Sequence, residues 1–539
     1  MLLINPSKYK FGGSFSHYVP LPLPMTIGTL SAYMDANGYP SKVYDEELEL
    51  IDAQNIERII EGLPKPYIFG ISILTSQAAR AYNLAKFLKT TYPDCIVIVG
   101  GFHATALPEE SLNTGAIDFV VRGEGERVLL ELYEAIRGDR KDFSEIKGIC
   151  FKDGDQVIST PDAALIADLN TLPLFPYYKY VELLKNCPSD VKYDWGFTIT
   201  SRGCPYECNF CAQRMMTGIT YRYQSVENVL KNLNVLVNEL GATNIYLMDD
   251  NFLTQKTRVK ELCDGIYESG LWEKCEFSLQ TRADDFNEKL MPYLQKARFT
   301  TVGFGLEVGT DRLMETLKKD IKVETYFKSA ELANRYGLGV ALYLMFGVPG
   351  ETSEDREQAY QIVKKIKPVM AKVANLIPFP GTPLYDDSLK NSPRLNIVGT
   401  WESFDHPLRT LGFPLKKPAP LPYVPEDASE WEITRDIIKY NFLNILQLNK
   451  IVGVVSSKSK HWWARMKPRW YLYPMEYYHL IKIGLILVSN LSFALLPLWL
   501  TEPIMEFLYP ELQKRVPEKK RSVYIAPEWS KESQRKVRA

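Results

Sequence analysis

The first 145 residues alternate short apolar runs with longer amphipathic segments. The apolar runs are rich in β-branched residues, as in strands buried on both faces of a parallel sheet: Leu2–Asn5, Lys42–Asp45, Tyr67–Ser72, Cys95–Val99 and Asp118–Val121. Helical patterns such as Met25–Asn37 and Gln77–Thr90 lie between them. This alternation predicts a doubly wound, Rossmann-like α/β domain over residues 1–145.

A second and more regular series of strand and helix patterns begins at Phe197. Its six strand candidates are Phe197–Ser201, Asn244–Met248, Glu276–Gln280, Thr301–Leu306, Gly339–Met345 and Val373–Ile377. Helical patterns separate them, at Val226–Leu240, Arg258–Ser269, Thr325–Tyr336 and Ser353–Ile366. Six such units predict a partial (β/α)6 barrel over residues 196–390, with its working residues at the carboxyl ends of the strands.

Two less regular segments complete the predicted organisation. Residues 146–195 contain a hairpin, with its turn at Lys152–Asp155, and then a proline-bearing linker. Residues 391–539 are predicted as a mainly helical C-terminal region whose tail, from Arg515 onward, is polar, basic and expected to be disordered.

The C-terminal region also carries an uncharged stretch, Ile483–Thr501, preceded by a basic segment rich in tryptophan and tyrosine at 458–473. Basic residues interleaved with aromatic ones are typical of a membrane–water interface. Three interpretations stay open for the uncharged stretch: buried helices that cap the barrel, an interfacial hydrophobic hairpin, and a membrane span.

Composition narrows the function classes. The 539 residues suffice for two or three domains, and a net charge of −1 gives no general attraction for nucleic acid. The 8 cysteines are sparse apart from one triplet, which argues against a disulfide framework. The N-terminus is predicted to open on a strand, not a signal peptide. We therefore expect a cytoplasmic protein, with peripheral contact at the inner face of the cell membrane left open.

The cysteine triplet is the main chemical signal. Cys204, Cys208 and Cys211 follow the first predicted barrel strand with the spacing C-x3-C-x2-C. A structural zinc site normally takes four ligands, and no fourth cysteine or histidine lies close by in the sequence. Three thiolates in one short loop suit an iron–sulfur cubane in which one iron stays open to a small molecule.

The motifs around this loop resemble those of the radical S-adenosylmethionine (SAM) superfamily. They include Phe210 before the last cysteine, the run Asp249–Phe252 after the second barrel strand, and GFGLEVG at 303–309 after the fourth. Two further motifs resemble a subgroup with an N-terminal cobalamin-binding domain: MFGVPGET at 345–352 and PFPGTPLY at 378–385. That domain is echoed by GISILTSQ (70–77), VGGFHAT (99–105) and VVRGEGE (120–126).

The resemblance implies a [4Fe–4S] cluster, SAM and cobalamin as cofactors. Cys204, Cys208 and Cys211 would hold three irons, and SAM would chelate the fourth and yield a 5′-deoxyadenosyl radical. Candidate cofactor contacts are Phe210, Asp249, Asp250, Glu307, Gly100 and Gly101. The two aspartates could instead be a helix-cap pair and Glu307 a structural carboxylate, and Arg282 is a lesser candidate for a cofactor carboxylate.

Two histidine observations qualify the cobalamin prediction. The loop after the first strand lacks the D-x-H-x-x-G motif that supplies a cobalt ligand in many cobalamin domains. In this subgroup that implies binding without a protein histidine; the alternative is a vestigial domain or a different ligand. We interpret His103 as a satisfied turn histidine.

Five of the 8 cysteines lie outside the triplet. Four of them are expected to be buried thiols: Cys95, Cys150, Cys263 and Cys275. The fifth, Cys187, lies in the linker.

These features favour a cobalamin-dependent radical SAM C-methyltransferase acting on a hydrophobic substrate, such as a lipid, an isoprenoid or a tetrapyrrole. An oxidative cyclase like the anaerobic magnesium-protoporphyrin ester cyclases is the second enzymatic hypothesis. A non-catalytic cobalamin sensor is the third, and the intact triplet argues against it. The expected partners are the substrate and a one-electron donor such as flavodoxin or ferredoxin, with no nucleic acid. No catalytic side chain is assigned.

Overall fold

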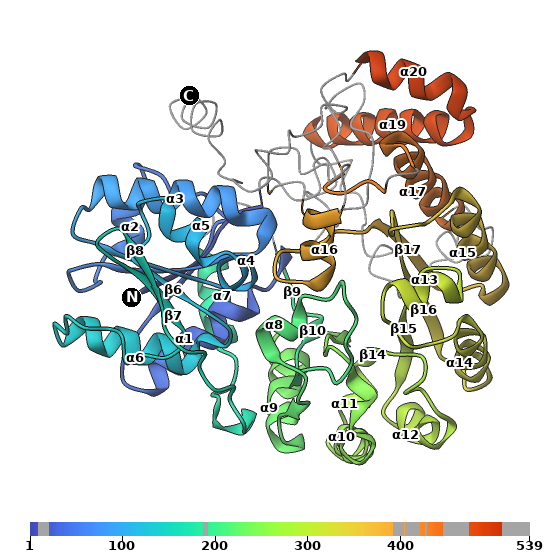
Figure 1. The fold of residues 1–539 in the computed structure, drawn as a ribbon. Helices are drawn as coiled ribbons and strands as arrows, with labels where there is room; N and C mark the ends of the chain where they lie inside the picture. Colours follow the sequence, from blue (N-terminus) through green and yellow to red (C-terminus); the bar gives the residue numbers. More distant parts are fainter. Residues whose placement is uncertain are drawn as a thin grey trace.

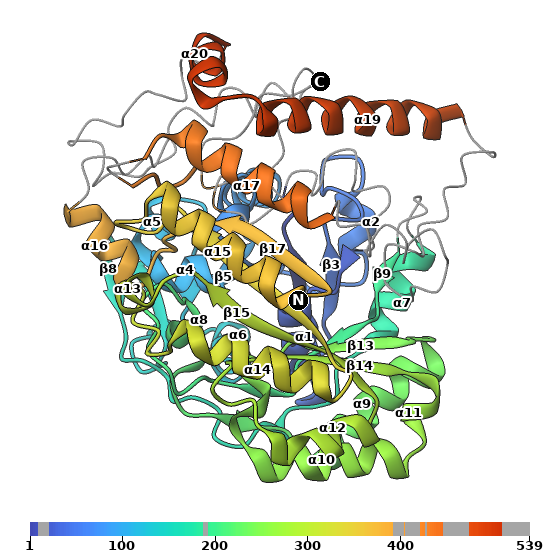
Figure 2. The ribbon, with the colours of Figure 1, turned by 90° about the vertical axis from the view of Figure 1, so that its right-hand side faces the viewer.

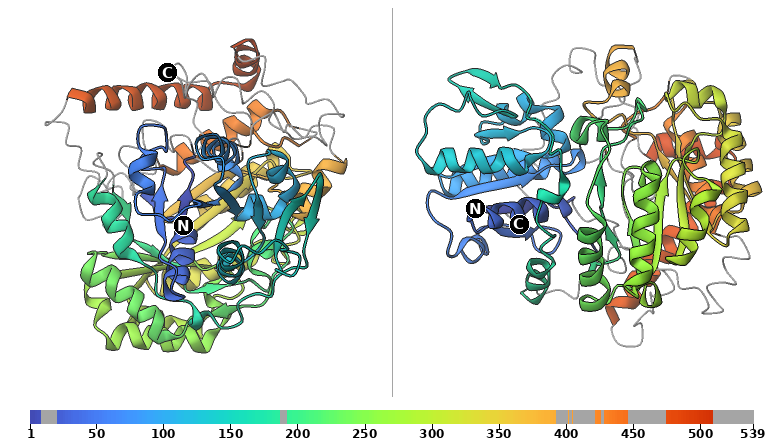
Figure 3. Two further views of the ribbon diagram at one scale, coloured as in Figure 1. Left: turned by 90° about the vertical axis from the view of Figure 1, so that its left-hand side faces the viewer. Right: turned by 90° about the horizontal axis from the view of Figure 1, so that it is seen from below.

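The computed structural model describes residues 1–8, 21–186, 192–391, 401, 404, 421–425, 428–445 and 474–508. Two α/β units stand side by side, the N-terminal one in blue and the barrel in green and yellow (Figure 1; Figure 3, right). Three predictions fall on residues outside this description: the linker cysteine Cys187, the basic aromatic segment 458–473 and the tail from Arg515. The same holds for most of the loop after the first strand.

The N-terminal unit is a seven-stranded sheet in the order β3-β1-β4-β5-β6-β7-β8. Its first five strands are parallel: β1 (Leu2–Asn5), β3 (Lys42–Asp45), β4 (Ile68–Ser72), β5 (Ile96–Gly100) and β6 (Phe119–Val121). The helices between them are α1 (Met25–Ala36), α2 (Ile56–Ile60), α3 (Ala78–Thr91), α4 (Phe102–Ala106), α5 (Pro108–Asn113) and α6 (Gly125–Arg137). The buried apolar strands thus form the predicted doubly wound sheet.

The hairpin of β7 (Ile149–Asp153) and β8 (Gln156–Ser159) extends this sheet. β7 pairs antiparallel with β6, so the hairpin belongs to the N-terminal sheet and not to the connecting segment in which the sequence placed it. A buried face explains the difference, since Ile149 and Cys150 are fully buried. The connector then continues through α7 (Tyr177–Lys185) and β9 (Tyr193–Asp194), which pairs with β2 (Leu21–Pro22).

The second unit is a six-stranded parallel sheet in the order β10-β13-β14-β15-β16-β17. The strands are β10 (Phe197–Thr198), β13 (Asn244–Leu247), β14 (Glu276–Thr281), β15 (Phe299–Glu307), β16 (Gly339–Phe346) and β17 (Met370–Asn375). The main helices are α8 (Gln213–Thr217), α9 (Val226–Asn234), α10 (Lys256–Glu268), α11 (Leu271–Lys274), α12 (Met291–Lys296), α13 (Asp311–Thr316), α14 (Val323–Arg335), α15 (Ser353–Ile366) and α16 (Pro383–Asn391). β10 and β17 are the two edges, so the barrel is partial, as predicted.

The first predicted barrel strand divides in two. β10 ends at Thr198, and β11 (Ser201–Arg202) turns away to pair antiparallel with β12 (Arg222–Tyr223). The break redirects the chain just before the cysteine loop.

The C-terminal helices build outward from the barrel edge. α17 (Glu430–Ile445) packs on β17, and α19 (Pro474–Leu495) and α20 (Leu498–Leu508) pack in turn on α17 (Figure 2). A small apolar cluster joins these helices: Trp431, Ile438, Phe493, Ala494 and Met505. Within the described residues no helix is long and apolar enough to cross a membrane.

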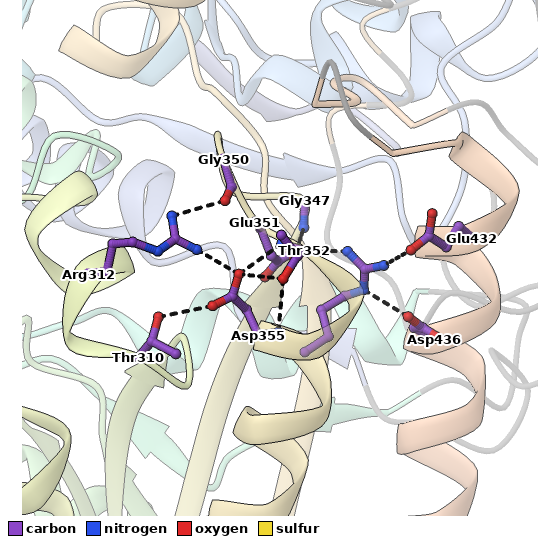
Figure 4. Close-up of polar contacts among 10 residues, drawn as sticks. Thr310, Arg312, Gly347, Gly350, Glu351, Thr352, Asp355, Glu432 and Asp436 are labelled. Atoms are coloured by element: carbon purple, nitrogen blue, oxygen red, sulfur yellow. Dashed lines mark hydrogen bonds and ion pairs between the residues drawn. The ribbon is translucent and has the colours of Figure 1, made fainter.

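Arg356 fastens α17 to the barrel. Its side chain is fully buried on α15, donates to Asp436 at 2.7 Å and to Glu432, and lies 3.5 Å from Glu351 (Figure 4). Glu351 also accepts the Gly347 amide at 2.6 Å, and burial raises the pKa of Glu351 to about 8. The polar residues of the GVPGET motif thus brace the turn after β16 and the helix docked beside it.

Candidate functional site

The cysteine loop lies between β11 and α8, beside the carboxyl end of β10. Cys204 and Cys208 are partly buried, Cys211 is exposed, and all three are free thiols. Gly203 before the first cysteine has φ +89°, and a Cβ there would lie 2.2 Å from the Thr220 carbonyl oxygen. Only glycine fits this entry to the loop.

Main-chain and side-chain bonds hold the loop against two barrel elements. The Asn209 amide donates to the Leu317 carbonyl at 3.2 Å, its side chain donates to Thr316 at 2.9 Å, and its carbonyl accepts from the Leu384 amide at 3.0 Å. The loop conformation is therefore fixed by the end of α13 and by the PFPGTPLY motif.

Tyr206 makes a fourth attachment. Its hydroxyl donates to Asp285 at 3.0 Å, and the Arg282 guanidinium lies 3.6 Å from its ring centroid. Arg282 also donates twice to Asp284, at 3.0 and 2.9 Å. Its charge is therefore already paired within the protein, while its planar face stacks on the cysteine loop.

The thiols are in a setting that a bound cation would complete. Burial raises the pKa of Cys204 and of Cys208, the two partly buried thiols. At Cys208 the Lys319 and Arg282 cations oppose this rise. Among the residues the structure describes, no three Cys, His, Asp or Glu side chains gather around a single ion position. A cubane places each thiolate on a different iron, so its ligands need not converge on one ion.

Asp249 and Asp250 follow β13 with different surroundings. Asp249 is fully buried; it accepts from the Thr200 amide at 2.5 Å, the Thr200 hydroxyl at 2.6 Å and the Ser201 amide at 3.2 Å. Its carboxylate thus braces the break between β10 and β11. Asp250 is only partly buried and accepts the Gly203 amide at 3.2 Å, and burial beside Asp249 raises its pKa to about 6.

We expect Asp249→Asn to destabilise the fold by about 1.5–3 kcal/mol, the range for a hydrogen bond to a charged group. Buried Arg258, 3.8 Å from Asp249, would also lose its counter-charge. Thermal and denaturant unfolding of the apoprotein measure the effect, with Asp250→Asn as the matched control that leaves stability nearly unchanged. Equal stability of the two variants would contradict a bracing role for Asp249.

Glu307 is engaged in a buried ion pair. It stands at a bulge of β15 with φ +61°, and its carboxylate lies 2.8 Å from Lys319 Nζ. A Cβ on Gly305 would lie 2.2 Å from that carboxylate, which explains the glycine in the GFGLE motif. Burial lowers the pKa of Lys319, but its neighbouring groups, chiefly the Glu307 carboxylate, together have a larger effect, so that the pKa of Lys319 is raised. The sequence analysis missed Lys319, because a lysine pair after a helix usually lies in solvent.

The barrel interior presents aromatic and polar groups together. The Tyr246 hydroxyl donates to Gln280 at 2.8 Å and lies 3.4 Å from that of Tyr343. Gly303 leaves room for both tyrosines, since a Cβ there would lie 3.0 Å from the Tyr343 ring. Ile199 and Met248, just past the ends of β10 and β13, are 39% and 41% exposed, so apolar side chains are uncovered at the mouth of the barrel.

The predicted ligand-approach glycines lie at the carboxyl end of β5. Gly101 has φ +90°, and a Cβ there would lie 2.9 Å from the Ile73 carbonyl oxygen, while one on Gly100 would lie 3.3 Å from that of Val121. Contact with neighbouring strands therefore accounts for both. Phe210 packs partly buried against the core.

His103 is buried and its Nε2 is hydrogen-bonded, but its buried Nδ1 has no hydrogen-bond partner among the described residues, so the satisfied histidine of the sequence interpretation is confirmed only at Nε2. Its Nε2 lies 3.0 Å from the Tyr82 hydroxyl and 3.2 Å from Glu110. The Trp401 ring stacks edge-on at 4.9 Å and donates its indole N–H to Glu110 at 2.9 Å. A residue of the C-terminal region thus covers this part of the N-terminal unit.

The two units meet at the cysteine loop. A Cβ on Gly381 would lie 2.4 Å from Met215 Sδ of α8 and 3.1 Å from Ala106 Cβ of α4. The carboxyl-end elements of both sheets are therefore in direct contact around α8.

A buried ionic cluster joins the units beside this contact. Glu124 binds Arg202 at 3.1 Å and Arg222 at 2.9 Å, and Glu126 binds Arg202 at 2.5 Å. Both glutamates are 5% exposed, and Arg222 is 6% exposed. Burial raises the pKa of Glu124, but its partners, chiefly the two arginines, together lower it by more, so that the pKa lies below its usual value. The glutamates of the RGEGE motif therefore bind the N-terminal unit to the two short strands that flank the cysteine loop.

Family comparisons identify both units. The pattern described as the radical SAM superfamily matches residues 198–363, and that of the B12 binding domain matches residues 22–133. An uncharacterized methyltransferase of Pyrococcus horikoshii is 31% identical over 67% of this chain and 77% of the relative. These matches confirm the resemblance drawn from the motifs.

Other relatives divide between two reaction types. An anaerobic magnesium-protoporphyrin IX monomethyl ester cyclase of Rubrivivax gelatinosus is 26% identical over 72% of this chain and 69% of its own length. A hopanoid C-3 methylase of Methylococcus capsulatus is 24% identical over 70% of each. The fold is similar to a solved cobalamin-dependent SAM radical enzyme, OxsB, with a TM-score of 0.64 and 16% identity over all of this chain and 79% of that one.

Proposed function

Because this chain belongs to the radical SAM superfamily and carries a B12-binding domain, we propose that it is a cobalamin-dependent methyltransferase that replaces a C–H hydrogen of a hydrophobic small molecule with a methyl group. The cofactors of such an enzyme, a [4Fe–4S] cluster, SAM and cobalamin, supply the radical and the methyl group. The observation that carries the proposal is the contact of the cysteine loop's helix α8 with α4 of the B12-binding domain. In this proposal both cofactor regions would lie at this contact between the two units.

The chain's own residues would hold and orient these groups. The thiolates of Cys204, Cys208 and Cys211 are the cluster ligands in this proposal. Lys319 and Arg282, although each is paired with a carboxylate, lower the pKa of Cys208 and so favour its thiolate. We assign the partly exposed Asp250 to a cofactor ammonium, because the Asp249 carboxylate already accepts from the Thr200 and Ser201 backbone amides.

The side chains at the barrel mouth support the proposed hydrophobic substrate. Ile199 and Met248 are uncovered apolar side chains, and the tyrosine pair offers flat aromatic surface with few charges. A carbon skeleton with little polarity would be bound by such walls, and their packing would keep water from a reactive radical. We propose a lipid, isoprenoid or tetrapyrrole substrate, and a flavodoxin- or ferredoxin-type electron donor in a reducing cytoplasm.

The test is anaerobic turnover with SAM carrying a trideuterated methyl group. After reconstitution with iron, sulfide and cobalamin, the reduced enzyme is incubated separately with a polar-lipid extract and a tetrapyrrole extract. We expect 5′-deoxyadenosine and one product heavier by a labelled methyl group, detected by mass spectrometry.

The other hypotheses give different results in the same experiment. A cyclase would form 5′-deoxyadenosine and a product without label. A sensor would form neither. Either result would overturn the methyltransferase proposal, whereas label in the lipid fraction or the tetrapyrrole fraction would assign the substrate class.

A further inference from the structure

The outer face of α19 and α20 is unusually apolar. Ten of the 21 exposed large hydrophobic residues found in the described chain lie on these two helices or, for Leu496, in the turn between them: Leu485, Leu487, Val488, Leu495, Leu496, Trp499, Leu500, Ile504, Phe507 and Leu508. Val488 and Leu495 are each 65% exposed, Trp499 is 76% and Phe507 is 84% exposed. An exposed apolar face of this kind is typical of an interaction site.

The helices divide cleanly into a packed side and an open side. Phe493, Ala494 and Met505 pack in one cluster with side chains of α17. Ile486 is also buried, and the buried Asn490 side chain donates to the Ile486 carbonyl at 2.6 Å. At 100° per residue, the exposed apolar side chains of α20 cover about half of its circumference, bordered on one edge by Glu502 and Glu506. Both helices form the outermost layer above α17 (Figures 1 and 2).

The shape of this face fits a surface contact. The uncharged part of α19, residues 483–495, spans about 20 Å at 1.5 Å per residue, against about 30 Å for a hydrocarbon core. Pro497 lies between the two helices, so the uncharged stretch 483–501 does not form one continuous helix. Short amphipathic helices with exposed Trp, Phe and Leu bury their apolar face in the headgroup region.

The sequence nearby indicates the charge of the partner. The run that connects α17 to α19 carries basic residues among its aromatics, whereas residues 483–501 carry no charge: the basic residues at 458–469 are Lys458, Lys460, Arg465, Lys467 and Arg469. Anionic headgroups attract such clusters by about 1 kcal/mol per residue near the surface. A protein partner would more often meet a polar rim around an apolar centre.

We propose that the outer face of α19 and α20 docks the enzyme on the surface of a bilayer containing anionic lipid. Trp499 and Phe507 insert at the headgroup level, and Val488 and Leu495 extend the contact along α19. The proposal goes beyond the methyltransferase function and does not depend on it. Docking on a bilayer would also give the enzyme access to a hydrophobic substrate.

Vesicle flotation tests the proposal with the full-length protein, in the absence of SAM and reductant. The vesicles contain phosphatidylglycerol and phosphatidylethanolamine, or phosphatidylcholine alone. We expect the wild type to float with the anionic vesicles, and Trp499→Ser/Phe507→Ser to lose at least about tenfold in vesicle partitioning. Val488→Glu/Leu495→Glu, which places two carboxylates on the face, should lose vesicle partitioning to the same extent.

The matched control is Tyr178→Ser, which removes a 64% exposed aromatic ring on α7 and should bind like the wild type. Unchanged unfolding midpoints show that the variants are folded. Absence of wild-type flotation, equal flotation on phosphatidylcholine, or unaffected variants would each overturn the proposal. A lipid-free dimer that the serine variant converts to a monomer, seen by analytical ultracentrifugation, would assign the face to a second copy instead.

Discussion

Replacing Cys208 with alanine is expected to remove the iron–sulfur cluster and reduce 5′-deoxyadenosine formation to the level of an enzyme-free control. The reason is stoichiometric, because three cysteines leave no spare ligand for the three irons. Cys208 is also the thiol whose pKa Lys319 and Arg282 lower, against the effect of burial. Without its thiolate, the buried Lys319–Glu307 pair, 2.8 Å apart, has no anionic cluster beside it.

Iron and sulfide content, visible absorbance and 5′-deoxyadenosine formation measure this outcome after anaerobic reconstitution. Cys263→Ala is the matched control, since Cys263 is fully buried on α10. It should keep the cluster and lose only modest stability. A Cys208→Ala protein that still bound iron and sulfide would contradict the ligand assignment, and a wild type that held zinc alone would replace the cubane with a structural metal site.

The architecture of both units could be predicted because their strands are buried on two faces. Runs such as Leu2–Asn5 and Gly339–Phe346 are almost entirely apolar, so their pattern needs no knowledge of the partner strand. The break of the first barrel strand could not be predicted. It depends on Asp249, which is distant in sequence and binds the Thr200 and Ser201 amides.

Roles within the candidate site were harder to predict than its location. Asp249 and Asp250 are the same residue type at adjacent positions, and only burial separates the bracing carboxylate from the accessible one. Glu307 is a similar case, since its carboxylate is already paired with Lys319. Trp401 reaches the N-terminal unit across 291 residues of sequence distance to Glu110, which no local pattern encodes.

The contact between the units was equally invisible to sequence patterns, and it carries a large expected effect. Glu124→Gln should lower methyl transfer about 100-fold while 5′-deoxyadenosine formation stays near the wild-type rate. The substitution keeps the shape of the side chain and removes the charge that holds Arg202 and Arg222. A displacement of about 1 Å between reacting groups costs about two orders of magnitude in rate. The cysteine loop itself keeps its attachments at Asn209 and Tyr206.

The same substitution should lower the free energy of unfolding by about 3–5 kcal/mol, because Arg222 is left buried without its counter-charge. Glu124→Gln/Arg222→Met should recover part of this stability, since neither charge then remains. Glu49→Gln is the matched control: its pair with Arg58 is 2.6 Å long but 32% and 54% exposed, and such pairs contribute about 0–1 kcal/mol.

The ratio of labelled methyl product to 5′-deoxyadenosine, measured on cluster-loaded protein, distinguishes misalignment of the two units from a loss of stability. A loss of folded enzyme lowers both products together, whereas misalignment of the two units lowers only the methyl product. An unchanged ratio in Glu124→Gln would mean that the ionic cluster stabilises the contact without setting its register. The contact of Gly381 with Met215 and Ala106 would then be the remaining element that positions the two units.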